Sequence, residues 1–175
     1  MAEYYYLVST LTYLKFGEEP PLGSKKFLAE CARWLSAGDM KILSRASRGG
    51  LEARAQDAPV LAEWKSFDGR LRGELAGVRA ARGKEETYKA SGAVKAILSQ
   101  ENPLLAETEF EKARWDFLED MAARYFFDIN ALIVYFLKLQ ILERLARFDK
   151  DAGEKFFYHY CEVDYEKKVR QYNGD

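Results

Sequence analysis

The C-terminal half of the chain carries a nearly unbroken helical pattern. Between residues 102 and 160 it contains one proline, Pro103, and one glycine, Gly153. Large apolar residues recur there at intervals of three and four, which places them on one face of an α-helix. Because proline and glycine disfavour helix interiors most strongly, their scarcity indicates long helices. The sequence therefore predicts an all-α fold.

Size and composition indicate a single domain. The chain has 175 residues, of which 48% are apolar, enough for a core of ordinary size. We expect one all-helical domain over residues 1–175, a bundle of about six to eight helices that ends in a long antiparallel pair. The Arg-rich segment at about residues 69–90 is the candidate for a mobile part.

Capping residues and helix breakers predict the individual helices. Ser24, Asp39 and Asp128 are placed as N-caps, and Gly69 and Gly73 predict that the long helix containing them bends or splits. The first segment also has strand propensity, but its apolar spacing favours a helix. Loops are expected at 17–21 and 79–88. The helices are expected at residues 3–14, 24–36, 39–46, from Pro59 onward, 93–98, from Pro103 onward, 129–148, and from Asp149 or Asp151 onward.

Reactive side chains do not gather into a catalytic set in this sequence. His159 is the one histidine, and the two cysteines, Cys31 and Cys161, lie far apart. A zinc site needs four ligands, and a general base needs a nucleophile or an orienting carboxylate nearby. We therefore expect no catalytic residue, no metal and no cofactor, and we interpret the cysteines as reduced thiols of a cytoplasmic protein. The opening residues lack the pattern of a signal peptide.

An acidic stretch covers residues 107–120. Glu107 and Glu111 are four residues apart, a spacing that could hold a hard cation. The simpler interpretation is a solvated helix face, on which the carboxylates alternate with Lys112 and Arg114.

A basic cluster in the middle of the chain is the candidate partner contact. With a formal net charge of −1, the sequence gives no electrostatic reason to expect nucleic acid as a partner. A solvated face is the simpler interpretation of the cluster; the alternatives are an acidic protein surface, anionic lipid or, least favoured, RNA. The cluster consists of Arg70, Arg72, Arg79, Arg82 and Lys84.

The most apolar window of the sequence, residues 129–145, contains five polar residues and is too short for a membrane span.

Both ends of the chain resemble a poorly characterised bacterial family encoded among the genes of V/A-type ATPases. The resemblance is carried by EYYYLVSTLTYLKFGEEPP at the start, NPLLAE at 102–107, RWDFLED around Trp115, and FDINALIVYFLKLQILERLARFDKDAGEKFF at 127–157. Thr12 stands where the family is expected to have proline. The Arg-rich middle is covered poorly, and the shared motifs are packing motifs without catalytic residues.

The resemblance implies a helical protein similar to the C subunit (eukaryotic d) of rotary ATPases, which couples the central stalk to the membrane rotor ring. We therefore expect a non-catalytic subunit or an accessory or assembly protein of such an ATPase, involved in ion transport. It would lie on the cytoplasmic face of the inner membrane, held there through its partners. The alternative is a helical ligand-binding or regulatory module that acts on soluble partners.

Overall fold

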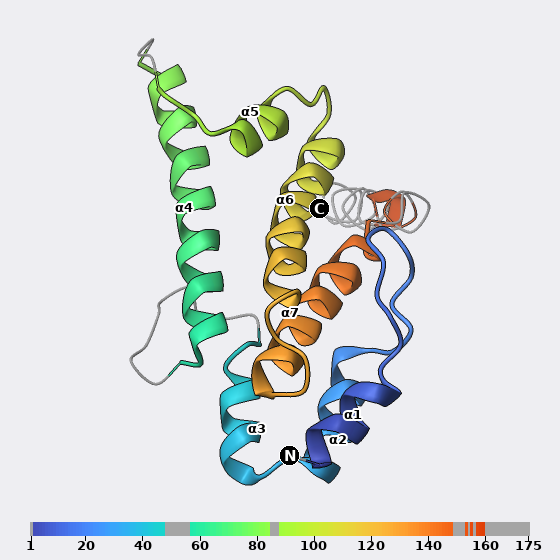
Figure 1. Cartoon of the computed structure of the whole chain (residues 1–175). Coiled ribbons are helices and arrows are strands. Elements are labelled where there is room, and N and C mark those ends of the chain that lie inside the picture. The colour runs from blue at the N-terminus through green and yellow to red at the C-terminus, as the bar shows by residue number, and fades with distance from the viewer. Residues whose placement is uncertain are drawn as a thin grey trace, which may run out of the picture. The chain divides into compact units, whose positions relative to one another are not determined.

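The computed structural model describes residues 2–47, 57–84, 88–148, 153, 155 and 157–159. The chain divides into two units, residues 1–145 and 146–175. Across the described residues helix is the only regular secondary structure, which confirms the all-α prediction. In the first unit the helices are α1 Ala2–Thr10, α2 Ser24–Trp34, α3 Ala37–Ser44, α4 Pro59–Arg82, α5 Gly92–Leu98, α6 Pro103–Ala122 and α7 Ile129–Leu145 (Figure 1). In the second unit, residues 153, 155 and 157–159 are helical, whereas residues 146–148 are not.

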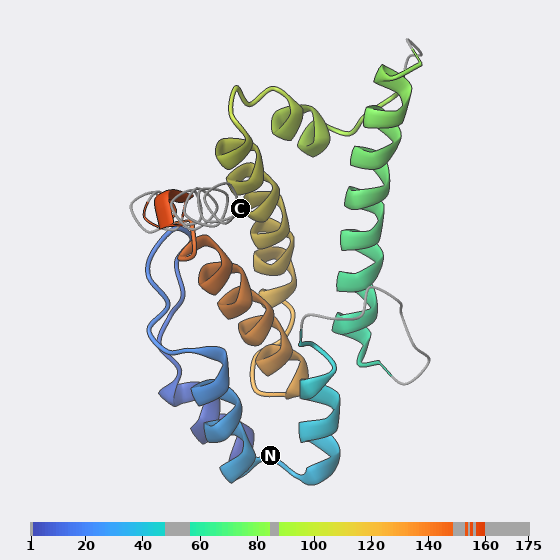
Figure 2. The same ribbon diagram turned by 180° about the vertical axis from the view of Figure 1, so that it is seen from behind.

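Helices α6 and α7 form an antiparallel pair that crosses obliquely through the first unit (Figures 1 and 2). Helix α7 also contacts α1, α2, α3 and α4, so it is the central element of the core. The apolar face predicted from the helical spacing is the face that the structure buries. Leu118, Met121, Ile133, Phe136, Leu137 and Ile141 are buried, and Ile129 and Leu145 are half-buried against them.

A second, smaller core lies between α4, α5 and α6. Figure 2 shows α5 bridging the upper ends of α4 and α6. This arrangement holds α4 beside the α6–α7 pair and makes it one wall of the groove described below. Its buried members are Leu71, Leu75, Val78, Val94, Ile97 and Phe110.

The boundary between α2 and α3 differs from the prediction. Ser36, not Asp39, is the N-cap of α3, and its Oγ accepts a hydrogen bond from the Asp39 backbone N–H at 3.1 Å. Gly38 lies inside α3, and α2 ends earlier, at Trp34. The Trp34 side chain is 45% exposed. Because Ser36 and Asp39 are three residues apart and both can cap, the sequence pattern fits either start.

Ser24 has a different role from the expected N-cap. It is the first residue of α2, after Gly23 in the cap position. Its backbone N–H and its hydroxyl each donate to a carboxylate oxygen of Glu143 on α7, both at 2.6 Å. The half-buried carboxylate of Glu143 therefore has its hydrogen-bond partner in Ser24.

Helix α4 is continuous over its 24 residues, so the expected split did not occur. A side chain added at Gly69 or Gly73 would meet no atom within 4 Å, which places both on the open face of the helix. The turn expected at 79–88 begins only after Arg82, and α7 ends at Leu145 instead of residue 148. Gly69 and Gly73 each reduce the stability of α4 by about 1 kcal/mol relative to alanine. Because α4 is continuous, the packing of its opposite face offsets this loss.

Asp128 caps α7 as predicted, which allows a stability test. Its Oδ1 accepts from the Ala131 backbone N–H at 2.9 Å. Asp128→Ala is expected to lower the free energy of unfolding by about 1 kcal/mol, because one N–H of the first turn loses its partner. Urea denaturation measures the change. Asp120→Ala, at an exposed carboxylate of α6, is the control and should change stability by less than about 0.5 kcal/mol; equal losses would contradict the capping role.

Candidate functional site

Two adjoining cavities form a groove along α4. The first, of about 430 Å³, is lined by residues of α4, α6 and α7 and by the end of α3. The second, of about 400 Å³, is lined mainly by α4 and α6. Arg72 and Arg144 line both cavities, so the two adjoin at these side chains. We call them together the α4–α6 groove. Each falls in the size range of small-molecule sites.

The charged side chains along the α4–α6 groove are mainly cationic. Apolar walls come from Leu61, Trp64, Leu75, Phe110, Leu137 and Ile141. The cations that line the groove are Arg45, Lys65, Arg72, Arg79, Arg114 and Arg144, and the carboxylates that line it are Asp68 and Glu107.

Arg114 is the centre of a buried ion-pair network at the floor of the groove. Its Nη1 lies 2.7 Å from Glu111 Oε2, and its Nε lies 2.9 Å from Asp68 Oδ1. The second pair is close enough for an ion pair but lacks hydrogen-bond alignment. The guanidinium also lies over the rings of Trp64, at 4.9 Å, and Phe110, at 5.4 Å. A planar, delocalised cation suits such stacking, so Arg114 joins the apolar and ionic parts of the site.

Each carboxylate of the network binds two guanidiniums. Asp68 also accepts from Arg72 Nε at 2.9 Å, and Glu111 lies 3.0 Å from Arg144 Nε. Arg144 pairs with Glu107 as well. The spacing of Glu107 and Glu111 therefore serves a guanidinium, not a hard cation. The predicted solvated face is wrong for Glu111 and Arg114, because both are buried.

The groove carries more positive than negative charge among the described residues. Lys65 pairs with Asp57 at 2.8 Å, which adds a fourth carboxylate to Asp68, Glu107 and Glu111. Six cations line the groove, and of these Arg79 has no carboxylate partner among the described residues. Burial, and secondarily the neighbouring Arg72, lower the pKa of Arg144.

The predicted basic cluster is divided by the structure. Arg72 and Arg79 line the α4–α6 groove, whereas Arg70, Arg82 and Lys84 are exposed and outside its lining. Arg72, besides its bond to Asp68, lies over the Phe110 ring at 5.1 Å. No carboxylate of the described residues pairs with Arg79. The role of the five residues as a partner contact stays a prediction.

Two further residues considered from the sequence, His159 and Cys31, are among those that the structure describes. His159 is exposed, and Cys31 is a buried free thiol whose pKa is raised by burial to about 12. Cys161 lies outside the described residues. In the part of the chain that the structure describes, His, Cys, Asp and Glu form no group of three that could hold a metal ion. None of its helices is long and apolar enough to cross a membrane.

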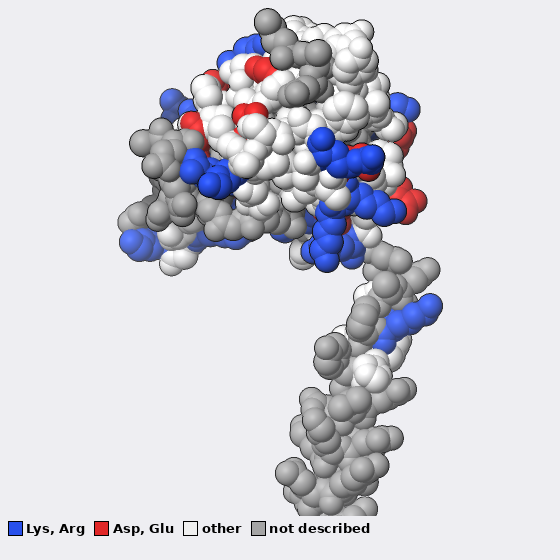
Figure 3. All heavy atoms as spheres, turned by 90° about the horizontal axis from the view of Figure 1, so that it is seen from below, with Lys and Arg blue, Asp and Glu red and all other residues white. Residues whose placement is uncertain are grey.

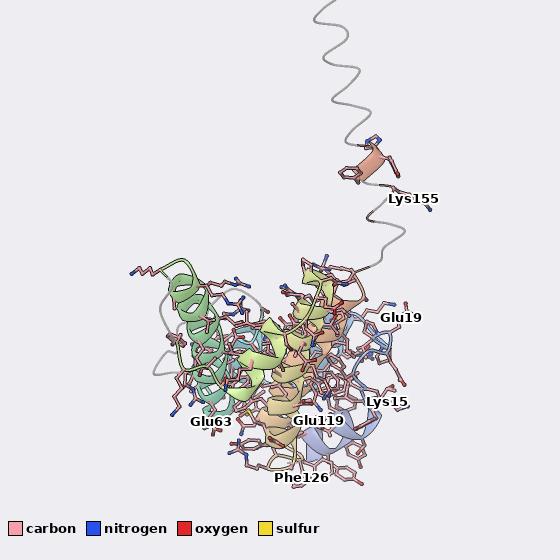
Figure 4. All side chains as sticks on the ribbon, turned by 90° about the horizontal axis from the view of Figure 1, so that it is seen from above. Lys15, Glu19, Glu63, Glu119, Phe126 and Lys155 are labelled. Atoms are coloured by element: carbon pink, nitrogen blue, oxygen red, sulfur yellow. The ribbon has the colours of Figure 1, made fainter. Side chains whose placement is uncertain are left out.

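Aromatic side chains gather at the end of the first unit where α1 meets the α6–α7 link. Tyr6 is 61% and Phe126 66% exposed, and the Tyr5 ring contacts the Phe127 ring at 4.9 Å between centroids. Figure 3 shows this end, where a broad area lacks charged side chains, and Figure 4 shows Phe126 at the outer edge. We call Tyr5, Tyr6, Phe126 and Phe127 the aromatic end surface.

A comparison with protein families found one similarity. Residues 93–162 match a family described as a protein of unknown function (DUF2764). The matched residues include α6 and α7, and so contain Glu111, Arg114 and Arg144 of the groove and Phe126 and Phe127 of the aromatic end surface. No curated protein and no solved structure matched the chain.

Proposed function

We propose that the protein is a non-catalytic subunit or assembly factor of a bacterial V/A-type rotary ATPase, with a role similar to that of the C (d) subunit. Its partners would be the central stalk and the membrane rotor ring. In that role it would be cytoplasmic and would reach the inner membrane through its partners. The observation that carries the proposal is the aromatic end surface.

Clusters of exposed aromatic side chains are uncommon on protein surfaces that contact only solvent. Aromatic residues are enriched in protein interfaces and supply much of the binding energy there. The aromatic end surface combines two positions of α1 with two of the α6–α7 link. Beneath it a cavity of about 250 Å³ is lined by Val8, Ala122 and Val134, among others, and could accept an apolar side chain of a partner. Such a surface fits docking.

The resemblance of the sequence supports the choice of partner. The segments at 102–107, around Trp115 and at 127–157 form α6, α7 and the residues that follow. The opening segment forms α1. Tyr5, Tyr6 and Phe127 of the aromatic end surface therefore belong to segments that resemble the ATPase-associated family, and Phe126 directly precedes one of them. The family matched at 93–162 has no assigned function and adds nothing to this choice.

Affinity purification from native membranes tests the proposal. The tagged protein should retain ATPase subunits when the complex is kept intact. The double variant Tyr6→Ser/Phe126→Ser should lose most of this association while staying folded, because both side chains are largely exposed. Trp34→Ser/Tyr88→Ser changes two exposed aromatics outside the surface and is the matched control. Absence of ATPase subunits from the wild-type sample would refute the proposal.

The alternative, a ligand-binding or regulatory module, is favoured by a separate observation, the α4–α6 groove. Binding there and docking at the aromatic end surface involve different residues, so the two roles are compatible. Gene neighbourhood distinguishes the primary role: adjacency to genes for ATPase subunits A, B and D supports the ATPase, whereas a metabolic or regulatory operon supports the alternative.

A further inference from the structure

We propose that the α4–α6 groove is a binding site for a small molecule that carries two or more phosphate groups. This inference is independent of the ATPase proposal. It rests on the placement of Arg72, Arg79 and Arg144 and on the volumes of the two cavities that form the groove.

Arg72 and Arg79 provide donors along one wall. They are seven residues apart on α4, about 10.5 Å along the helix axis. Arg79 makes no ion pair with a described carboxylate. Arg72 shares Asp68 with Arg114, so one buried carboxylate serves two guanidiniums. Arg72 is also 43% exposed at its side chain, which leaves donor groups directed to solvent. These two guanidiniums can therefore take an anion without losing the buried network.

Arg144 provides the opposite wall. It belongs to α7 and lines both cavities together with Arg72. An anion that lies beside both side chains would be attracted by both positive charges, and a bound charge gains more in a partly desolvated groove than in open water.

Phosphate fits this arrangement better than a single carboxylate. A carboxylate is planar and pairs with the edge of one or two guanidiniums in its own plane, whereas a phosphoryl group directs its oxygens in three dimensions. The cations approach from α4 and α7, on two sides of the groove. The separation of Arg72 and Arg79 further favours a ligand with more than one phosphate. Cavities of about 430 and 400 Å³ have room for a ligand as large as a nucleoside diphosphate.

Calorimetric titration of the full chain with inorganic pyrophosphate, and separately with ADP, tests the inference. We expect saturable binding to one site for at least one of the two. Arg72→Gln/Arg79→Gln should weaken this binding by about tenfold or more, the loss expected for charge-assisted hydrogen bonds. Arg70→Gln/Arg82→Gln removes the same charge from the same helix outside the groove and should keep affinity within about threefold, since distant charges are screened by salt.

Far-UV circular dichroism and the Tm of each variant verify that both pairs stay folded. Equal weakening by the two double variants would overturn the inference, because it would indicate a response to net charge alone. Absence of saturable binding of either probe to the wild-type chain would overturn it as well. Sedimentation with phosphatidylglycerol vesicles separates a lipid headgroup from a soluble phosphate. Vesicle binding without binding of pyrophosphate or ADP would refute a soluble ligand.

Discussion

Replacing Phe136 with alanine is expected to lower the free energy of unfolding by about 3–5 kcal/mol. Phe136 is 1% exposed in the centre of α7, and its ring stacks on that of Phe27 from α2 at 5.4 Å between centroids. The substitution removes buried apolar surface and leaves a cavity between two helices that are fixed by other contacts. Because neighbouring side chains fill such a cavity only in part, the loss exceeds the transfer free energy of the ring.

Urea denaturation followed by circular dichroism measures the loss. Phe126→Ala is the matched control, because it removes the same side chain at a position that is 66% exposed. That variant should change stability by less than about 0.5 kcal/mol. A loss below about 1 kcal/mol for Phe136→Ala would contradict the central position of α7 in the core.

The α6–α7 core could be predicted from sequence because its signal is local. Apolar residues that recur every three or four positions identify the buried face of a helix without knowledge of the tertiary structure. Ile133 and Ile141, which lie on the apolar face that this periodicity identifies, are accordingly buried. The start of α3 could not be fixed in this way, because Ser36 and Asp39 are both good caps. The hydrogen bond between them in the structure shows that both take part, with Ser36 as the cap.

The ion-pair network could not be predicted because its contacts join distant parts of the chain. Asp68 and Arg114 are far apart in sequence, as are Glu111 and Arg144, and only the packing of α4 and α7 against α6 brings them together. Locally, an alternation of acidic and basic residues is typical of a solvated face. One usable signal was present: Phe110 and Trp115 flank the pair Glu111 and Arg114, which places charged residues beside the apolar face.

The aromatic end surface shows a similar limit. An aromatic residue in an amphipathic pattern is assigned to the core by default, since aromatics supply large buried areas. Phe126 and Phe127 lie in the link after α6, where helical periodicity no longer says which direction faces the core. Which aromatics remain exposed depends on where α1 packs, and that contact is not local in sequence.

Arg114→Ala is expected to destabilise the protein by about 3–5 kcal/mol, the cost of breaking a buried ion pair on one side. Asp68 and Glu111 are almost fully buried, and each would keep one guanidinium, from Arg72 and Arg144 respectively. The lost guanidinium also covers the rings of Trp64 and Phe110. Lys112→Ala is the matched control on the same helix: Lys112 pairs with the exposed Asp116, and its loss should cost less than about 1 kcal/mol.

A double variant separates the cost of removing one of the two guanidiniums that Glu111 binds from the loss of packing. Glu111→Leu/Arg114→Met replaces both partners by apolar side chains, so no charge is left without its partner at that position. Arg144 would keep Glu107, and Asp68 would keep Arg72. We therefore expect the double variant to be more stable than Arg114→Ala by about 1–3 kcal/mol in urea denaturation. If the double variant is less stable than Arg114→Ala, the desolvated carboxylate is not the main cause of the loss, and the stacking on Trp64 and Phe110 must supply most of the stability that Arg114 contributes.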